Sequence, residues 1–388
     1  MSQSSLHRPV TAQDVAERAG VSRSAVSRTF SNNGSVAQAT REKVLKAAEE
    51  LGYQVNMLAQ SMNKQRSTLI GVVTTRLSDP FRSELLERLL QEIQQAGFQA
   101  LVTEINSEDE LEPTLRRFTQ FRVSGVIVTS GQPPSELVAE CVRMKIPVVA
   151  INRESALAGV DIVKSDNRSG AAMAANQLLA AGCCHLAWVN VAPTASTWSG
   201  IARAEGFRQA LNDSLATNEI RLTELTTEDA SYEGGRLAAY RLCHQEFAND
   251  STSNPDSKSS KKPDSIHKNK VEQQSVDGVF CANAQIACGF LDGMREHGKD
   301  APKDFQLIGF DDTPQTRFYS YQLSTLKQNI DELARKALHC LQQRTKDPER
   351  PQRVESVSVE LLLRNTSPNP YQTRNPQHLD NMLKQQHM

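Results

Sequence analysis

Residues 22 to 28 form a run of polar side chains that can hydrogen-bond to the edges of base pairs and to phosphate oxygens. Arginine offers paired donors that match guanine, and serine hydroxyls both donate and accept hydrogen bonds. Val26 points inward at helical spacing, which leaves its neighbours on an open face. The open-face positions are Arg23, Ser24, Ala25, Ser27 and Arg28. This run predicts a helix that enters the major groove of DNA.

Two short helical patterns, separated by a turn at Gly20, would position this face. Thr11 is the expected N-cap of the first helix, with Asp14 as its capping-box partner. Gly20 permits a tight turn, and Ser22 can cap the second helix. A third amphipathic segment, residues 38–51, completes a three-helix unit. The spacing alone fits a buried helical hairpin equally well, so the helix-turn-helix interpretation depends on further features.

Charge is the first of these features. Residues 1–66 carry nine basic and five acidic side chains, whereas the whole chain of 388 residues has a formal net charge of -1. Local positive charge attracts phosphates by releasing counterions. No apolar run is long enough for a membrane helix, and the N-terminus lacks the apolar core of a signal peptide. We therefore expect a cytoplasmic protein without membrane contact.

The seven cysteines do not form a recognisable metal or redox motif. Their number is odd, no C-x-x-C occurs, and Cys183 and Cys184 lack a second pair at zinc-site spacing. We expect reduced, mostly buried thiols, no metal and no cofactor. The eight histidines form no H-E-x-x-H motif, and no G-x-S-x-G or phosphate loop occurs, so the chain is not expected to be an enzyme.

From Leu69 onward, short β-rich runs alternate with amphipathic helical patterns. Expected strands include residues 69–74, 148–151 and 306–310, and expected helices include residues 84–96 and 206–212. This alternation predicts parallel sheets covered by helices. About 300 residues exceed one comfortable core, so we expect two α/β lobes with a ligand cleft at the carboxyl ends of the strands.

Several separated motifs resemble the lac-repressor (LacI/GalR) family of bacterial transcription regulators, in family order and spacing. The head motifs are D-V-A-E-R-A-G-V-S-R-S-A-V-S-R, V-A-Q-A-T-R-E-K-V and L-G-Y-Q-V-N-M-L-A-Q-S-M. The landmarks of the body are Asp79-Pro80-Phe81, Ile151-Asn152-Arg153, Ser165-Asp166-Asn167, Arg203-Ala204-Glu205-Gly206-Phe207, Asn283, Ile308-Gly309-Phe310-Asp311-Asp312, Leu326-Lys327-Gln328 and residues 360–366.

The resemblance implies a domain order. A helix-turn-helix DNA-binding domain would span residues 8–53, and a hinge helix residues 54–67. A two-lobed domain similar to periplasmic sugar-binding proteins, which binds the effector and dimerises, would span residues 68–367. Residues 368–388 would form a flexible tail. Residues 249–275 are almost free of apolar side chains and read as a disordered surface insertion.

The resemblance also assigns DNA contacts. Thr11 and Asn56 would touch phosphate or sugar, and Arg23 and Ser24 are the best candidates for reading bases. Met62 stands where the family usually has a leucine that wedges between base pairs of the minor groove. The complete expected set is Thr11, Ser22, Arg23, Ser24, Ser27, Arg28, Tyr53, Asn56, Ala59 and Met62.

Carried over position by position, the family implies an effector pocket of eight residues. Phe81 would wall the ligand, Arg203 would give it two parallel donors, and Asp311 would accept from its hydroxyls. The expected set is Phe81, Arg82, Ser130, Asn152, Trp198, Arg203, Asn283 and Asp311. Arg82 replaces a common aromatic residue, which favours an anionic ligand such as a sugar acid or sugar phosphate.

We therefore expect a dimeric repressor that binds a pseudo-palindromic operator in double-stranded DNA. A carbohydrate-like effector would control its affinity. Two alternatives stay open at this point: a regulator with a purine or other non-sugar co-repressor, and a solute-binding protein without DNA function.

Overall fold

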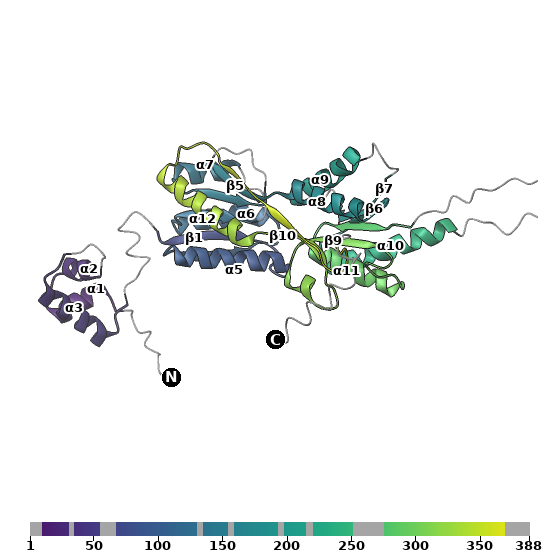
Figure 1. Ribbon diagram of the computed structural model, residues 1–388. Helices are drawn as coiled ribbons and strands as arrows, with labels where there is room; N and C mark the ends of the chain where they lie inside the picture. The colour runs from purple at the N-terminus through teal and green to yellow at the C-terminus, as the bar shows by residue number, and fades with distance from the viewer. Residues whose placement is uncertain are drawn as a thin grey trace, which may run out of the picture. The chain divides into compact units, whose positions relative to one another are not determined.

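The structure is a computed structural model that describes residues 10–30, 35–54, 67–129, 135–153, 159–192, 198–214, 220–250 and 275–368. The chain divides into two compact units, Met1–Thr68 and Leu69–Met388. In Figure 1 the first unit carries the purple helices and the second carries both sheets. The expected hinge helix lies almost entirely outside the described residues, as do the insertion and the tail.

The first unit is the expected three-helix head. Its helices are α1 (Ala12–Ala19), α2 (Arg23–Thr29) and α3 (Gln38–Leu51). Thr11 and Asp14 form a reciprocal capping box, in which the backbone N–H of Thr11 donates to the Asp14 carboxylate at 2.8 Å. Gly20 has a φ of 65°, and the Ser22 hydroxyl accepts from the backbone N–H of Ala25 at 3.2 Å. These local predictions are confirmed.

The core of the head corrects one expectation about α2. Val26 is fully buried as expected, but Ala25 is also buried, with an exposed fraction of 9%. Thr29 lies one turn further on, and its hydroxyl donates to the Ala25 carbonyl at 2.9 Å. Helix α2 therefore buries Ala25, Val26 and Thr29, with Val26 in one cluster with Val15 of α1 and Val44 of α3, and Ala25 does not belong to the open face.

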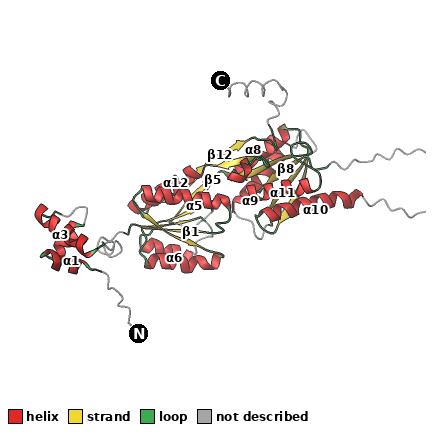
Figure 2. Cartoon of the chain, turned by 90° about the horizontal axis from the view of Figure 1, so that it is seen from below, coloured by secondary structure: helices red, strands yellow, loops and turns green. Residues whose placement is uncertain are grey.

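The first lobe of the second unit is a six-stranded parallel sheet in the order β11-β5-β4-β3-β1-β2. In Figure 2, α5 and α12 cover one face of this sheet and α6 covers the other. Its elements are β1 (Leu69–Thr74), α5 (Pro80–Gln95), β2 (Gln99–Glu104), α6 (Leu111–Gln120), β3 (Gly125–Val128), α7 (Ser135–Arg143), β4 (Val148–Ile151), β5 (Val160–Ser165), α12 (Ile330–Lys346) and β11 (Val354–Val357).

The second lobe has a sheet in the order β12-β10-β9-β8-β6-β7, parallel except for the antiparallel pair β10 and β12. Its elements are α8 (Asn167–Ala180), β6 (His185–Val191), α9 (Trp198–Ser214), β7 (Arg221–Thr227), α10 (Tyr232–Asp250), β8 (Gly278–Cys281), α11 (Ala284–Glu296), β9 (Gln306–Asp311), β10 (Ser324–Gln328) and β12 (Val359–Leu362).

The chain crosses between the lobes three times. The crossings join β5 to α8, β10 to α12, and β11 to β12, the last through the single residue Ser358. Figure 1 shows β10 at this junction, with the yellow C-terminal strands passing from one lobe to the other. Each lobe is thus completed by segments distant in sequence.

An aromatic cluster fixes α9, the helix that carries Arg203. Trp188 of β6, Phe207 of α9 and Phe280 of β8 lie with ring centroids 4.8 to 6.0 Å apart. All three rings are at most 2% exposed. Such packing holds α9 against the sheet at a defined depth, so the side chains on its cleft face have fixed positions.

Candidate functional sites

The open face of α2 is a polar surface on a helix whose other side is packed. Arg23, Ser24, Ser27 and Arg28 are exposed, as is the capping residue Ser22. The Ser22 and Ser24 hydroxyls lie 2.9 Å apart. The Arg23 guanidinium makes no hydrogen bond to the described residues. This arrangement matches a helix whose N-terminal residues meet base edges.

Thr11 and Tyr53, two further residues expected to contact DNA, lie outside α2. The Thr11 side chain is occupied by the capping box of α1. Tyr53 is half-buried, and its ring lies 5.7 Å from that of Phe30 at a tilt of 55°. Asn56, Ala59 and Met62 lie outside the described residues, so their DNA contacts stay predictions.

In the second unit, the strand ends of both lobes meet at a cavity of about 90 Å³. We call this cavity the cleft floor. Six of the eight expected effector residues line it together: Phe81, Arg82, Asn152, Arg203, Asn283 and Asp311. Trp198 lines a neighbouring chamber instead, and Ser130 lies outside the described residues.

Arg203 and Asp311 are the buried charges of the cleft floor. Their exposed fractions are 6% and 9%, and Arg203 Nη2 lies 3.3 Å from Asp311 Oδ1. Arg203 also donates to Asn167 Oδ1 at 2.8 Å and to the Ala282 carbonyl, and its guanidinium lies 3.5 Å from the ring centroid of Phe310. These contacts fix the guanidinium before any ligand binds.

Burial acts against both charges. It lowers the pKa of Arg203 and raises the pKa of Asp311, while the attraction between the two groups opposes each shift. Asp311 Oδ1 accepts from both Arg203 and Gln328, whereas Oδ2 has no partner among the described residues. The carboxylate therefore keeps one oxygen that can accept a hydrogen bond from a ligand hydroxyl.

Arg82 contacts two residues of its own lobe. Its Nε lies 3.3 Å from Asp79 Oδ2, and it also donates to the side chain of Thr75. Asp79 in turn caps α5 by accepting from the backbone N–H of Phe81 at 3.1 Å. Because Asp79 offsets the charge of Arg82, this arginine is weaker support for an anionic ligand than its sequence position suggests. Arg76 also lines the floor, and its guanidinium makes no ion pair with the described residues.

Gln328, which the sequence did not single out as a site residue, bridges the lobes at the cleft floor. Its Oε1 accepts from Asn152 Nδ2 at 3.2 Å and from the Ser165 hydroxyl at 2.5 Å, both in the first lobe. Its Nε2 donates to Asp311 Oδ1 at 2.7 Å in the second lobe. The only sequence signal was its place in the motif Leu326-Lys327-Gln328.

The backbone is strained where the strands end at the cleft. Arg76, Asn152, Asp311 and Asp312 have φ angles of 47°, 52°, 91° and 55°, in the left-handed region that non-glycine residues rarely adopt. Such conformations persist where the surroundings enforce them, and they cluster at ligand sites. Asn283 has an ordinary φ but a structural task as well, because its Oδ1 caps α11 by accepting from Ile286 N at 2.8 Å.

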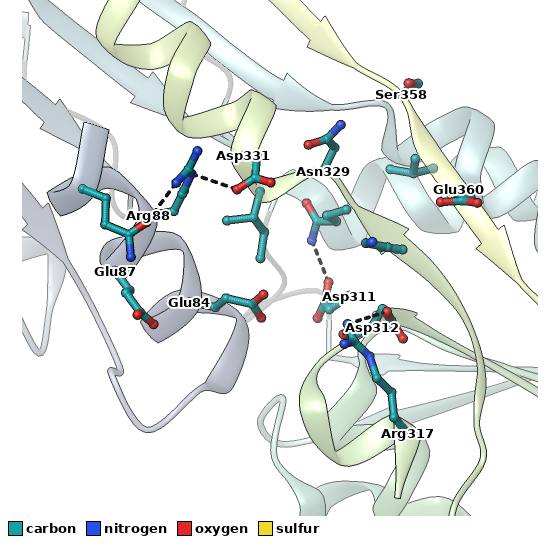
Figure 3. A pocket seen from close by; sticks show the side chains of 15 residues that line it. Glu84, Glu87, Arg88, Asp311, Asp312, Arg317, Asn329, Asp331, Ser358 and Glu360 are labelled. Atoms are coloured by element: carbon teal, nitrogen blue, oxygen red, sulfur yellow. Dashed lines mark hydrogen bonds and ion pairs between the residues drawn. The ribbon is translucent and has the colours of Figure 1, made fainter. Parts of the chain in front are cut away.

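Three further cavities adjoin the floor. One of about 150 Å³ shares Arg76, Arg203 and Asn283 with it, and one of about 440 Å³ shares Asn152, Arg153 and Ser199. A third, of about 670 Å³, shares Asp311 and Gln328 and is drawn in Figure 3.

The cavity in Figure 3 is dominated by carboxylates. Two ion pairs line its walls: Arg88 with Asp331 at 2.8 Å in the first lobe, and Arg317 with Asp312 at 2.9 Å in the second. Burial raises the pKa of Glu84 on its wall, and Arg317 opposes that rise. Its acidic lining residues are Glu84, Glu87, Asp311, Asp312, Asp331 and Glu360.

Profiles of known families match the chain in three stretches. "Bacterial regulatory proteins, lacI family" covers residues 11–56, "Periplasmic binding proteins and sugar binding domain of LacI family" covers residues 67–249, and "Periplasmic binding protein-like domain" covers residues 175–367. The chain belongs to the lacI family of bacterial regulatory proteins. This finding confirms the family resemblance of the motifs and the expected fold class.

Individual lacI-family relatives match along nearly their full length. The ribose operon repressor of Bacillus subtilis is 29% identical over 85% of this chain and 90% of its own. The transcriptional repressor PurR of Vibrio parahaemolyticus is 26% identical over 92% and 98%. The lac repressor dimer bound to operator and the anti-inducer ONPF superposes with a TM-score of 0.75 at 23% identity, over 93% of this chain and 100% of that one. The last likeness concerns the fold.

These relatives are named as transcription regulators, not enzymes. Among the described residues, no group of three or more histidine, cysteine, aspartate or glutamate side chains is placed to hold a metal ion. The described helices include none with the length and apolarity needed to cross a membrane.

Proposed function

We propose that this lacI-family protein is a transcription repressor that binds operator DNA through α2 and releases or tightens its hold when a small polar molecule binds between the lobes. The α2 face carries the proposal. Four exposed polar side chains stand on a helix that is capped at Ser22 and packed along Ala25, Val26 and Thr29. Such a helix can enter a major groove without losing its own core contacts.

The DNA contacts that we propose are divided by chemistry. Arg23 and Ser24 read base edges, and Ser22, Ser27 and Arg28 support them in the groove. Thr11, Tyr53 and Asn56 contact the backbone, and Ala59 and Met62 belong to the hinge segment that meets the minor groove. A homodimer would place two such heads on a pseudo-palindromic operator. The protein would act in the cytoplasm, where that operator lies.

The cleft floor is the effector site in this proposal. Arg203, Asn283 and the unpaired Oδ2 of Asp311 would bind hydroxyl groups, and Phe81 would cover an apolar face of the ligand. The names of relatives such as the ribose operon repressor support a carbohydrate as the ligand class. Asn152 contributes less directly, because its amide is shared with Gln328 and Ser165.

The operator can be identified even though the target genes are unknown. The full-length protein is incubated with a random double-stranded library, and bound sequences are enriched and read. We expect a pseudo-palindrome. Arg23→Ala should then weaken binding to the selected site by about tenfold, at a cost of roughly 1–3 kcal/mol, while binding to random DNA changes little.

Arg335→Ala is the matched control, because Arg335 is an exposed arginine of α12 that pairs with Glu332 on the same helix. It should leave operator binding unchanged. Enrichment of no common sequence, or full discrimination by the Arg23→Ala protein, would contradict the proposal. A thermal-shift panel of sugars, sugar acids, sugar phosphates and purines then identifies the ligand class.

A further inference from the structure

The cleft floor is smaller than most small-molecule binding pockets. Its volume is about 90 Å³, and the adjoining cavity beside Arg203 adds about 150 Å³, whereas small-molecule pockets usually enclose about 300–1,000 Å³. The chamber of about 440 Å³ lies on the other side of Asn152 and Ser199, which line both spaces. We call this space the side chamber. Because the two spaces share these residues, a ligand that fills the floor lies next to the chamber.

The side chamber has an aromatic wall on α9. Trp198 is 44% exposed and Ile201, one turn further along the same helix face, is 41% exposed. Large apolar side chains are usually covered, so a half-exposed indole inside a chamber is available for stacking. Polar groups surround it, among them Lys164, Asn167 and Glu205. An apolar face within a polar rim matches a sugar ring, whose faces are C–H and whose edge is hydroxyl.

The side chamber is also joined to the charges of the floor. Asn167 lines the chamber, and its Oδ1 accepts from Arg203 Nε at 2.8 Å. Its Nδ2 donates to the Ser165 carbonyl at 3.0 Å, so its orientation is fixed. An occupant of the chamber therefore contacts the residue that holds Arg203. The chamber is built by both lobes, since Lys164 lies in β5 of the first lobe and Trp198 begins α9 of the second.

We propose that the effector is a glycoside of at least two sugar rings, one on the cleft floor and the next stacked on Trp198 in the side chamber. This inference rests on the proposed function, because it takes the cleft as the effector site. It adds the ligand class, a disaccharide or longer, and it makes Trp198 a specificity residue. A pentose or hexose alone would leave the chamber to water.

Tryptophan fluorescence tests this directly, because the chain has two tryptophans and Trp188 is buried in the core. The full-length protein, without DNA, is titrated with cellobiose, maltose, lactose, sucrose and trehalose and with glucose, galactose, fructose and ribose. At least one disaccharide should bind about tenfold more tightly than its component monosaccharides and change the emission. Trp198→Ala should abolish the emission change and, by calorimetry, weaken that disaccharide about tenfold while altering monosaccharide binding less than about twofold.

Two further variants keep the test sharp. Ile201→Lys introduces charge on the same exposed face and should weaken the disaccharide selectively, even if Trp198→Ala were poorly folded. Tyr240→Ala removes an aromatic residue of α10 that is 49% exposed and lines none of these cavities, so it should change nothing.

Equal affinity for monosaccharides and disaccharides, no binding of any disaccharide, or an unchanged disaccharide affinity in both cleft variants would overturn the inference. The operator selection is independent of this result. A protein that binds a disaccharide but selects no operator retains the inference and loses the proposed function. A protein that selects an operator but binds no disaccharide loses the inference alone.

Discussion

A single amide, that of Gln328, occupies the point where the two lobes meet. Its oxygen accepts from Asn152 and Ser165 in one lobe, and its nitrogen donates to Asp311 in the other. An amide side chain can accept on one side and donate on the other without a net charge. Any rotation of one lobe against the other must break or rearrange these bonds, so Gln328 ties lobe orientation to the carboxylate of Asp311 at the cleft floor.

Asp161 is a second residue that joins distant segments, through its buried carboxylate. It is 0% exposed and accepts from Arg344 at 2.6 and 3.0 Å, from Arg350, and from the backbone N–H of Arg353 at 2.9 Å. Burial alone would raise the pKa of Asp161, but these donors outweigh it and hold the pKa below its ordinary value. Asp161 thereby fastens the end of α12 to β5.

Asp161→Asn should lower the free energy of unfolding by about 3–5 kcal/mol at pH 7, because it leaves two arginines without their buried counter-charge. A carboxylate with a depressed folded-state pKa stabilises above the unfolded-state pKa, near 4, and loses that stabilisation as pH falls through its folded-state value. The gap between wild type and variant should therefore shrink below about pH 4. Urea denaturation at several pH values measures it, with the exposed Asp213→Asn as control; an equal gap at pH 7 and pH 3 would contradict the assignment.

At the scale of elements, local signals were readable from the sequence and distant pairings were not. The capping box at Thr11, the turn at Gly20 and the cap at Ser22 each depend on residues within four positions, and all are confirmed. Strand β10 pairs with β12 more than thirty residues later, and both are short and partly polar, so neither was expected.

At the cleft floor, too, contacts between residues distant in sequence could not be predicted. Gln328 and Asn152 are 176 residues apart, and no period or motif could connect them. Six of the residues that the family resemblance indicated lie together at the cleft floor, because the motifs of a family carry information about its fold. It could not foresee that Asp79 engages Arg82, or that Asn167 rather than a ligand holds Arg203 Nε. Ala25 was misplaced because a small apolar residue beside Val26 fits either face of a short helix.

The packing of α10 on α11 gives an element-scale prediction. A Cβ on Gly289 of α11 would lie 1.8 Å from the backbone oxygen of Tyr232 in α10, and a backbone atom cannot rotate away. Gly289→Ala must push the helices apart, which we expect to destabilise the second lobe by about 1–3 kcal/mol or more. Thermal unfolding measures this, and Gln285→Ala on the same helix should have little effect. An unchanged melting temperature for Gly289→Ala would show that the helices can separate without loss.

At the scale of the whole molecule, the three crossings and the Gln328 bridge are the connections through which binding in the cleft can change the orientation of the lobes. Residues in the floor come from both lobes, so a ligand that bridges them favours one lobe orientation over others. A change in orientation also moves the first lobe, whose strand β1 begins at Leu69, directly after the DNA-binding unit. Effector and operator should therefore be linked through one equilibrium.

Linkage makes this quantitative. If a ligand changes operator affinity by some factor, operator DNA must change ligand affinity by the same factor, and such factors are typically about 5 to 150. Anisotropy of a labelled operator, with and without saturating ligand, gives one ratio, and calorimetry of the ligand with and without operator gives the other. We expect equal ratios well above one. Gln328→Leu should bring both ratios toward one, because it frees the lobes from one another. Lys327→Gln, at the exposed neighbouring position, should preserve them. A coupling that survives Gln328→Leu intact would mean that the lobes communicate through the crossings alone.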